Sequence, residues 1–183
     1  MNIILFDNKR EDFYPLSLTR PIAEFRLGVL TIKEKWESYF GSVSTFSNDY
    51  LAEKFNTKKI KEDNIWINSQ LLPSKDVVTE IKSLRVGEVL KKESIMLAFR
   101  NSEFILDELN NVESNSDFSF LSSISDIFSL NGEEIIADIA LINSQNNERS
   151  LQEITDSNIK RGKFPVYVEQ GATVENCYIN SSE

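Results

Sequence analysis

Histidine is absent from this 183-residue sequence, and cysteine occurs once, as Cys177. Without histidine, the chain cannot by itself supply a Ser–His or Cys–His nucleophile, a histidine-ligated zinc ion or an imidazole general base. A single cysteine permits no internal disulfide, which fits a reducing compartment. The remaining chemistry must use carboxylates, Lys and Arg, hydroxyls, backbone amides or a hard metal ion. That inventory suits phosphoryl-type transfer, which depends on positioning and charge neutralisation.

Basic residues are also outnumbered, since 20 Lys and Arg stand against 29 Asp and Glu, a formal charge of −9. The net field repels polyanions, so nucleic acid is not expected as a partner, whereas a nucleotide needs only a few local donors. The opening apolar run ends at Asp7, too early for a signal sequence or a membrane span. These features predict a cytoplasmic protein that does not bind membranes.

Hydrophobic periodicity predicts strands that alternate with helices. The predicted strands cover residues 3–6, 43–46, 64–68, 88–90 and 95–99, and the predicted helices cover residues 31–40, 50–55, 76–84 and 126–142. Thr31, with Glu34 three residues later, is typical of a helix-capping box. The polar residues 110–117 are predicted as a loop, and Gly132 as an interruption of the last helix. This alternation favours an open α/β sheet, which we expect to be mixed, with helices on both faces.

The pattern of the sequence changes after Lys163, because apolar residues no longer recur with a helical period. Val168 and Val174 are six residues apart and each is followed by Glu, a spacing that suits a coil of a left-handed β-helix. A single coil cannot bury its own face, so this segment is expected to continue in a longer protein. The predicted organisation is a domain over residues 1–150, a linker over 151–163 and a first β-helical coil over 164–183.

The segment 4–21 (ILFDNKREDFYPLSLTRP) resembles the opening of sugar-1-phosphate nucleotidyltransferases, in which a first strand runs into a phosphate-binding loop. The similarity is greater to a variant group of bifunctional UDP-N-acetylglucosamine diphosphorylases and glucosamine-1-phosphate N-acetyltransferases. Four blocks carry it: residues 18–36, residues 67–73 (INSQLLP), residues 126–131 (DIFSLN) and residues 168–172 (VEQGA). They occur in the expected order over nearly the whole chain.

The resemblance implies a Rossmann-like fold and transfer of uridylate from UTP to N-acetylglucosamine 1-phosphate, in sugar-nucleotide synthesis for the cell envelope. It also implies Mg²⁺ as cofactor and, in a longer protein, a homotrimer formed through the β-helix. Acetyl transfer is not expected of this chain, because that chemistry in the family lies between complete coils of neighbouring subunits.

Several positions depart from the family pattern. The two glycines of the phosphate loop are replaced by Asn8 and Arg10, and its Arg and Lys by Asp12 and Ile22. The metal-binding Asp falls near Gln70, whose amide supplies no carboxylate. A second hypothesis follows, namely a degenerate nucleotide-sugar-binding or scaffold domain of a β-helical acyltransferase; a ligand-sensing domain is a third.

The candidate site residues are mainly basic. Arg20 and Arg26 are predicted to hold phosphate, because guanidinium groups bind phosphate in bidentate fashion. The alternative is that they form surface ion pairs with nearby carboxylates. The further predicted nucleotide-binding residues are Arg10, Thr19, Lys33 and Asn68, where Lys33 could instead lie on a solvated helix face and Asn68 could form a turn. Asp7 is a weaker candidate for holding Mg²⁺, with capping of the loop as its alternative role.

Overall fold

The computed structural model of the chain describes residues 2–47, 49–55, 62–144, 151–156 and 159–182. The chain divides into two compact units, the first ending at Ile135 and the second beginning at Ile136. Among the described residues, no helix is both long and apolar enough to cross a membrane.

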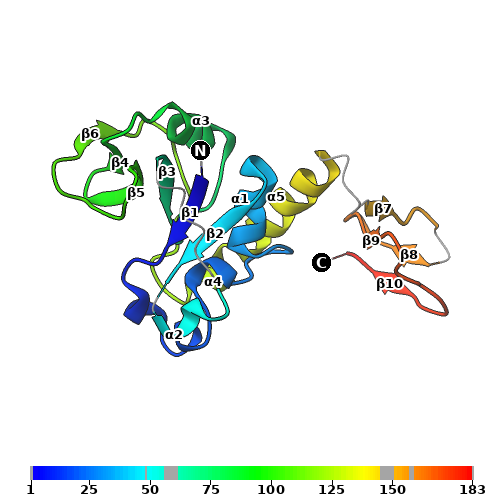
Figure 1. Cartoon of the computed structure of the whole chain (residues 1–183). Helices are drawn as coiled ribbons and strands as arrows, with labels where there is room; N and C mark the ends of the chain where they lie inside the picture. The colour runs from blue at the N-terminus through cyan, green and yellow to red at the C-terminus, as the bar shows by residue number, and fades with distance from the viewer. Residues whose placement is uncertain (1, 48, 56–61, 145–150, 157–158, 183) are drawn as a thin grey trace. The chain divides into compact units, whose positions relative to one another are not determined.

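A six-stranded mixed sheet forms the centre of the first unit (Figure 1). Its strands, in chain order, are β1 (Asn2–Phe6), β2 (Val43–Phe46), β3 (Asn64–Asn68), β4 (Glu88–Lys92), β5 (Ile95–Arg100) and β6 (Asn110–Glu113). The spatial order is β2-β1-β3-β5-β4-β6. Strand β1 pairs in parallel with both β2 and β3, whereas β5 runs antiparallel to β3 and β4. The predicted open α/β sheet is confirmed, and it is mixed.

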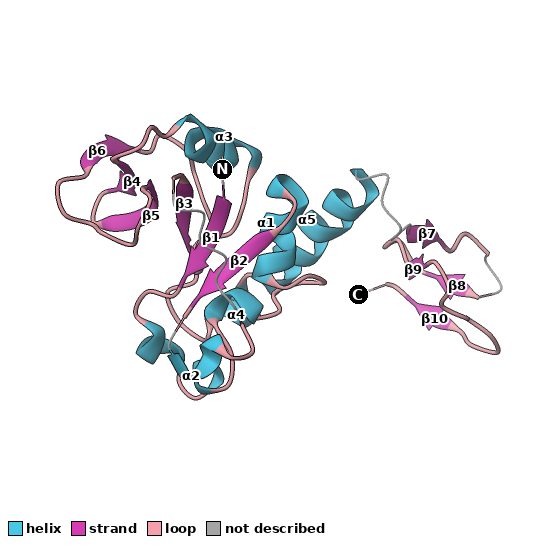
Figure 2. Ribbon diagram, viewed as in Figure 1, coloured by secondary structure: helices cyan, strands magenta, loops and turns pink. Residues whose placement is uncertain are grey.

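Figure 2 shows the helices in cyan. Along the chain, α-helices come between β1 and β2, between β2 and β3, after β3 and after β6. They are α1 (Ile32–Phe40), α2 (Asp49–Ala52), α3 (Lys75–Ser83), α4 (Asp126–Ser129) and α5 (Asn131–Ser144), and three short 3-10 helices lie between β1 and α1: η1 (Arg10–Phe13), η2 (Leu16–Leu18) and η3 (Ile22–Glu24). The capping box predicted for Thr31 and Glu34 is present, with both reciprocal hydrogen bonds formed. Helix α3 is capped by Ser74, whose hydroxyl accepts from the Val77 amide.

Three element predictions were wrong in detail. Residues 110–113, predicted as loop, form strand β6 at the edge of the sheet, where backbone pairing with β4 outweighs a polar sequence. The interruption predicted at Gly132 within the helix over 126–142 occurs two residues earlier, at Leu130, where α4 has ended and α5 has not yet begun. Helix α2 begins at Asp49 and ends at Ala52, whereas the prediction was a helix over residues 50–55.

Two apolar clusters pack on the sheet. The larger combines alternate residues of β1 and β3, such as Leu5 and Ile67, with Trp36 of α1 and Val77 of α3. The smaller contains the intervening strand residues, and none of its members belongs to a helix: Ile4, Phe6, Trp66, Val89 and Phe99, with Phe46, Met96, Phe104 and Leu109 packed against them. Phe104, from the loop after β5, lies 5.2–5.4 Å from four of these rings. Within the described part of the chain, a loop packs on this second cluster, so helices on both faces stay a prediction.

The second unit contains two short pairings. Strands β7 (Leu151–Glu153) and β9 (Tyr167–Glu169) are antiparallel, and β8 (Lys160–Arg161) and β10 (Ile179–Asn180) are parallel. Strands β7 and β8 lie within the segment predicted as a linker. A two-stranded pairing is not a β-helical coil, so the β-helix stays a prediction.

Candidate functional site

The carboxyl ends of β1 and β3 lie at one edge of the sheet, since the two strands pair in parallel and in register from Asn2–Asn64 to Phe6–Asn68. Strand β1 lies between β2 and β3, so the chain passes from one side of β1 to the other on its way from β2 to β3. In open α/β sheets, ligands bind outside the carboxyl ends of the strands at such a switch point. This edge is therefore the first place to look for a site.

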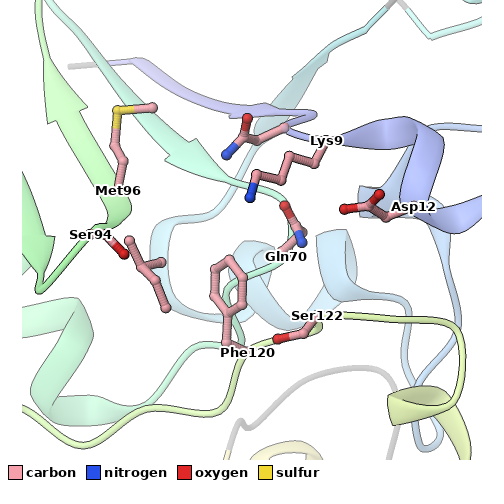
Figure 3. A pocket seen from close by; sticks show the side chains of 9 residues that line it. Lys9, Asp12, Gln70, Ser94, Met96, Phe120 and Ser122 are labelled. Atoms are coloured by element: carbon pink, nitrogen blue, oxygen red, sulfur yellow. The ribbon is translucent and has the colours of Figure 1, made fainter.

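A pocket of about 240 Å³ lies at this edge (Figure 3). The loop after β1, the turn after β3, the β4–β5 hairpin and the segment before α4 form its walls: Asn8, Lys9, Asp12, Gln70, Ser94, Ile95, Met96, Phe120 and Ser122. A more open pocket of about 270 Å³ adjoins it through Ile95 and is lined by Lys92 and Phe118 among others. Small-molecule sites typically enclose ~300–1,000 Å³, so the first pocket has room for part of a small-molecule ligand.

Lys9 is the cation of this pocket. Its backbone is left-handed, with φ 46° and ψ 46°, directly before η1. This conformation is one that favours glycine, and it falls between the two positions, 8 and 10, where the resemblance places the glycines of the phosphate loop. Lys9 is exposed and forms no ion pair with any other described residue. Its side chain points into the pocket (Figure 3), so its charge is available to an anion.

Gln70 also lines the pocket, and the residue is 3% exposed. Its Nε2 donates to the Leu121 carbonyl at 2.6 Å, which fixes the amide orientation because a carbonyl can only accept. Its Oε1 is buried without a hydrogen-bond partner among the described residues. A buried acceptor of this kind costs free energy unless a ligand or water satisfies it. Gln70 is therefore the clearest structural sign of a ligand in the pocket.

Asp7, at the end of β1, organises the loop beside the pocket and does not line the pocket itself. Its Oδ1 accepts from the Ile22 amide at 3.1 Å and its Oδ2 from the Ser47 hydroxyl at 2.8 Å. Burial raises the pKa of this carboxyl, while these hydrogen bonds and the Arg10 charge lower it by less. Of the two roles considered for Asp7, its geometry matches that of a loop cap.

Arg10 is buried behind the loop, 6% exposed. Its Nη2 donates to the Tyr50 hydroxyl at 2.5 Å, its guanidinium lies 5.2 Å from the centre of that ring, and its Nε is 3.8 Å from Asp7 Oδ2. The Tyr50 hydroxyl in turn donates to the Leu18 carbonyl at 2.9 Å. These contacts fasten the loop to α2 and occupy part of the donor set with which Arg10 was predicted to bind nucleotide.

The other predicted basic residues lie outside the pocket lining. Arg26 is exposed, donates through Nη1 to the Val29 carbonyl and lies 3.8 Å from Glu34. Lys33 pairs with Glu24 at 3.4 Å. Arg20 is exposed and forms neither a hydrogen bond nor an ion pair with the described residues. The pocket lining that contains Lys9 therefore includes none of Arg20, Arg26 and Lys33.

The two predicted polar residues have local partners. The Thr19 hydroxyl is 3.4 Å from the Leu16 carbonyl and is exposed. Asn68 is fully buried. Its Nδ2 donates to the Met96 carbonyl, and its Oδ1 accepts from the backbone N–H of Gln70 at 3.0 Å. Asn68 therefore forms the turn that presents Gln70 to the pocket.

Comparison with protein-family models matches residues 3–147 to a family described as sugar nucleotidyl transferase. This chain belongs to the sugar nucleotidyl transferase family. The match includes the six strands of the main sheet, apart from the first residue of β1, and every residue of the pocket. A search of curated proteins found no match.

Sugar nucleotidyl transferases are expected to use Mg²⁺, and the pocket of this family member is a poor match for a resident ion. Magnesium prefers carboxylate oxygens, and Asp12 is the one carboxylate among the described residues of the lining, which also contains the neutral Gln70 and the positive Lys9. Asp7 directs its oxygens at the Ile22 amide and Ser47. Within the described part of the chain, no three Asp, Glu or Cys side chains gather as metal ligands would. These residues do not fit a protein-held Mg²⁺ site.

None of the residues that line this sugar nucleotidyl transferase pocket was among the predicted site residues, and Lys9 and Gln70 are the most informative of those that sequence reasoning missed. Lys9 carried a usable signal, because it follows a buried strand directly and lies between the two replaced glycines of the resemblance. Gln70 was considered only as a missing carboxylate. Nothing in the sequence indicated that its Nε2 would be taken by Leu121 and its Oε1 left for a ligand.

Proposed function

We propose that this sugar nucleotidyl transferase domain joins uridylate to N-acetylglucosamine 1-phosphate. This is the reaction implied by its resemblance to the bifunctional UDP-N-acetylglucosamine diphosphorylases. In this reaction a phosphate oxygen of the sugar phosphate attacks the α-phosphorus of UTP in line, and pyrophosphate leaves. Any Mg²⁺ would arrive on the triphosphate, which supplies oxygen ligands of its own. In a longer protein, a β-helix would assemble the trimer.

One observation carries this proposal: the pocket at the carboxyl ends of β1 and β3 presents an unpaired lysine and a buried, unsatisfied acceptor. The Lys9 ammonium would neutralise phosphate charge, while Gln70 Oε1 would accept from a neutral donor of the ligand. The exposed Arg20 and Arg26 would steady the outer phosphates if the loop that carries them turns toward the pocket. Arg10 and Asp7 would hold that loop in place. Lys33 would hold helix α1 through its ion pair with Glu24.

Pyrophosphate release from UTP, N-acetylglucosamine 1-phosphate and Mg²⁺ tests the proposal. We expect Lys9→Gly to lower kcat/KM by about 10-fold or more, since a charge-assisted hydrogen bond contributes about 1.5–3 kcal/mol. Glycine suits the left-handed backbone at this position, so the variant removes the charge without straining the loop. Arg20→Ala and Arg26→Ala, assayed in parallel, show whether those side chains act on the phosphates.

Arg85→Ala is the matched control. Arg85 is an exposed cation just before β4, whose first residue, Glu88, pairs with Arg100 opposite the amino end of β3. It therefore lies at the other edge of the sheet from the pocket. If Arg85→Ala and Lys9→Gly reduce activity equally, the pocket is not the site.

The second candidate function is a binding or scaffold domain without turnover. It is favoured by Arg10, which is buried in loop contacts, and by Gln70, which stands where the family has a metal-binding carboxylate. Binding of UDP-N-acetylglucosamine without any pyrophosphate release, by a folded protein, would establish it in place of the enzyme.

A further inference from the structure

The charges around the β1–β3 pocket differ from those of a metal-dependent phosphate site. Its lining contains one cation, Lys9, and one carboxylate, Asp12, while its other residues are neutral. No ion pair joins Lys9 to Asp12 or to another residue of the described chain. An anion entering this pocket therefore meets a positive charge that is held on the protein and that forms no ion pair with a described carboxylate.

The backbone holds Lys9 in place for this role. The residue stands between β1 and η1, and the Asp12 amide closes the turn by donating to the Lys9 carbonyl at 3.1 Å. The adjoining Asp7 and Arg10 are fixed by their own partners, Ile22, Ser47 and Tyr50. The anchored loop thus leaves mainly the lysine side chain to order on binding, which lowers the entropic cost of holding a ligand.

Gln70 adds a second contact of a different kind. Its Oε1 is a neutral acceptor locked toward the pocket by the bond from Nε2 to Leu121. An amide oxygen repels phosphate oxygens, so it belongs beside a hydroxyl or N–H group of the ligand. Lys9 and Gln70 therefore define a ligand with an anionic part and a neutral donor part.

We propose that Lys9 takes the place of a divalent cation in this pocket, so that the diphosphate of a nucleotide sugar binds without metal. The inference rests on the proposed function, because it takes a nucleotide sugar as the ligand. It concerns binding of the reaction product; a metal carried by UTP in the forward reaction is a separate matter. The ammonium group pairs with the diphosphate, and Gln70 accepts from a hydroxyl or N–H of the same molecule.

Isothermal titration of the full chain with UDP-N-acetylglucosamine tests this inference, in excess EDTA and separately in excess Mg²⁺. We expect the same Kd in both buffers, within about twofold. Lys9→Gly should weaken binding about 10-fold or more in EDTA, since a charge-assisted hydrogen bond is lost. Lys9→Arg, which restores the charge, should recover part of the affinity, and Arg85→Ala should bind like the parent. Thermal unfolding of each variant verifies folding.

The outcomes separate the inference from the proposed function. Binding that requires Mg²⁺ overturns the inference and leaves the proposed function standing. Binding in EDTA that Lys9→Gly does not weaken overturns the assignment of Lys9. Absence of binding in both buffers, by a folded protein, overturns the proposed function together with the inference.

Discussion

At the scale of single residues, the loop after β1 combines strain with burial. Lys9 adopts a left-handed backbone that costs a residue with a side chain roughly 1–2 kcal/mol. The next residue, Arg10, is a buried cation, and Asp7 is a buried carboxyl. Such arrangements persist where the surroundings hold them in place, and they cluster at ligand sites. Here η1 and the contacts of Tyr50 provide that support.

Asp7 makes the stability of the fold depend on pH. Burial raises the pKa of its carboxyl in the folded state. The protonated carboxyl therefore contributes to the stability of the fold, and this contribution is lost as pH rises through the folded-state pKa. Asp7→Asn removes the titration and keeps an acceptor for the Ile22 amide. We expect the difference in unfolding free energy, parent minus Asp7→Asn, to fall as pH rises from about 4, the ordinary pKa of an Asp carboxyl.

Urea unfolding of both proteins at a series of pH values measures the difference. Asp12→Asn is the control, because Asp12 is an exposed carboxyl of the same loop. A difference that grows with rising pH would show that the contacts of Asp7 with Ser47 and Arg10 outweigh its burial.

Residue roles were the hardest part to predict from the sequence. The sequence predicts Arg20, Arg26 and Lys33 as phosphate- or nucleotide-binding residues, but their exposure and ion pairing depend on the fold. Arg26 pairs with Glu34, and Lys33 pairs with Glu24. The partners of each pair come close only once α1 has formed. The unsatisfied oxygen of Gln70 depends on Leu121, 51 residues away. Long-range contacts of this kind leave no local pattern.

At the scale of elements, α1 and α5 are joined by a buried ion pair. Lys35 Nζ lies 2.8 Å from Glu134 Oε2, and the two side chains are 2% and 14% exposed. Removing one partner of a buried pair leaves a charge in a poorly solvated place, at a cost of about 3–5 kcal/mol. Glu134→Ala should therefore lower the unfolding free energy by about 3 kcal/mol or more, measured by urea denaturation.

The neighbouring Glu133→Ala is the matched control, because Glu133 is exposed on the same turn of α5. We expect it to change stability by less than about 0.5 kcal/mol. The double variant Lys35→Met, Glu134→Leu should recover much of the loss, since well-packed apolar groups can replace a buried pair. Equal effects of the two single Glu variants would refute the structural role of the pair.

Elements with strong local signals were predictable. Strand β3 is an apolar run buried along its length, and α1 has a capping box and an apolar stripe, so both ends of α1 were placed correctly. Strand β6 lacked such a signal, because its residues Asn110–Glu113 are mostly exposed and it exists through pairing with β4. The break between α4 and α5 likewise occurs at Leu130, which has no helix-breaking character.

At the scale of the whole chain, the pocket and the C-terminal pairings belong to different compact units. Every pocket residue lies between Asn8 and Ser122, within the first unit. Strands β7 to β10 belong to the second unit, and the family match ends at residue 147, before them. The proposed nucleotide binding should therefore be insensitive to local damage in the second unit.

Gly162 offers a way to damage that unit selectively. A Cβ at Gly162 would lie 2.4 Å from the Ser181 carbonyl carbon, so a side chain would push apart β8 and β10. Gly171 has a positive φ as well, but a Cβ there would meet no described atom within 4 Å. Both Gly→Ala variants thus share the backbone strain of a left-handed residue, and Gly162→Ala alone adds a backbone clash.

We expect Gly162→Ala to speed hydrogen exchange of the Ile179 and Ser181 amides, which donate to the Ile159 and Arg161 carbonyls at 2.7 Å. Gly171→Ala should leave both amides close to their parent rates. Neither variant should change the affinity for UDP-N-acetylglucosamine, because no pocket residue belongs to the second unit. Weaker nucleotide binding by Gly162→Ala alone would mean that the second unit is coupled energetically to the site, and the pocket could then no longer be treated as a property of the first unit.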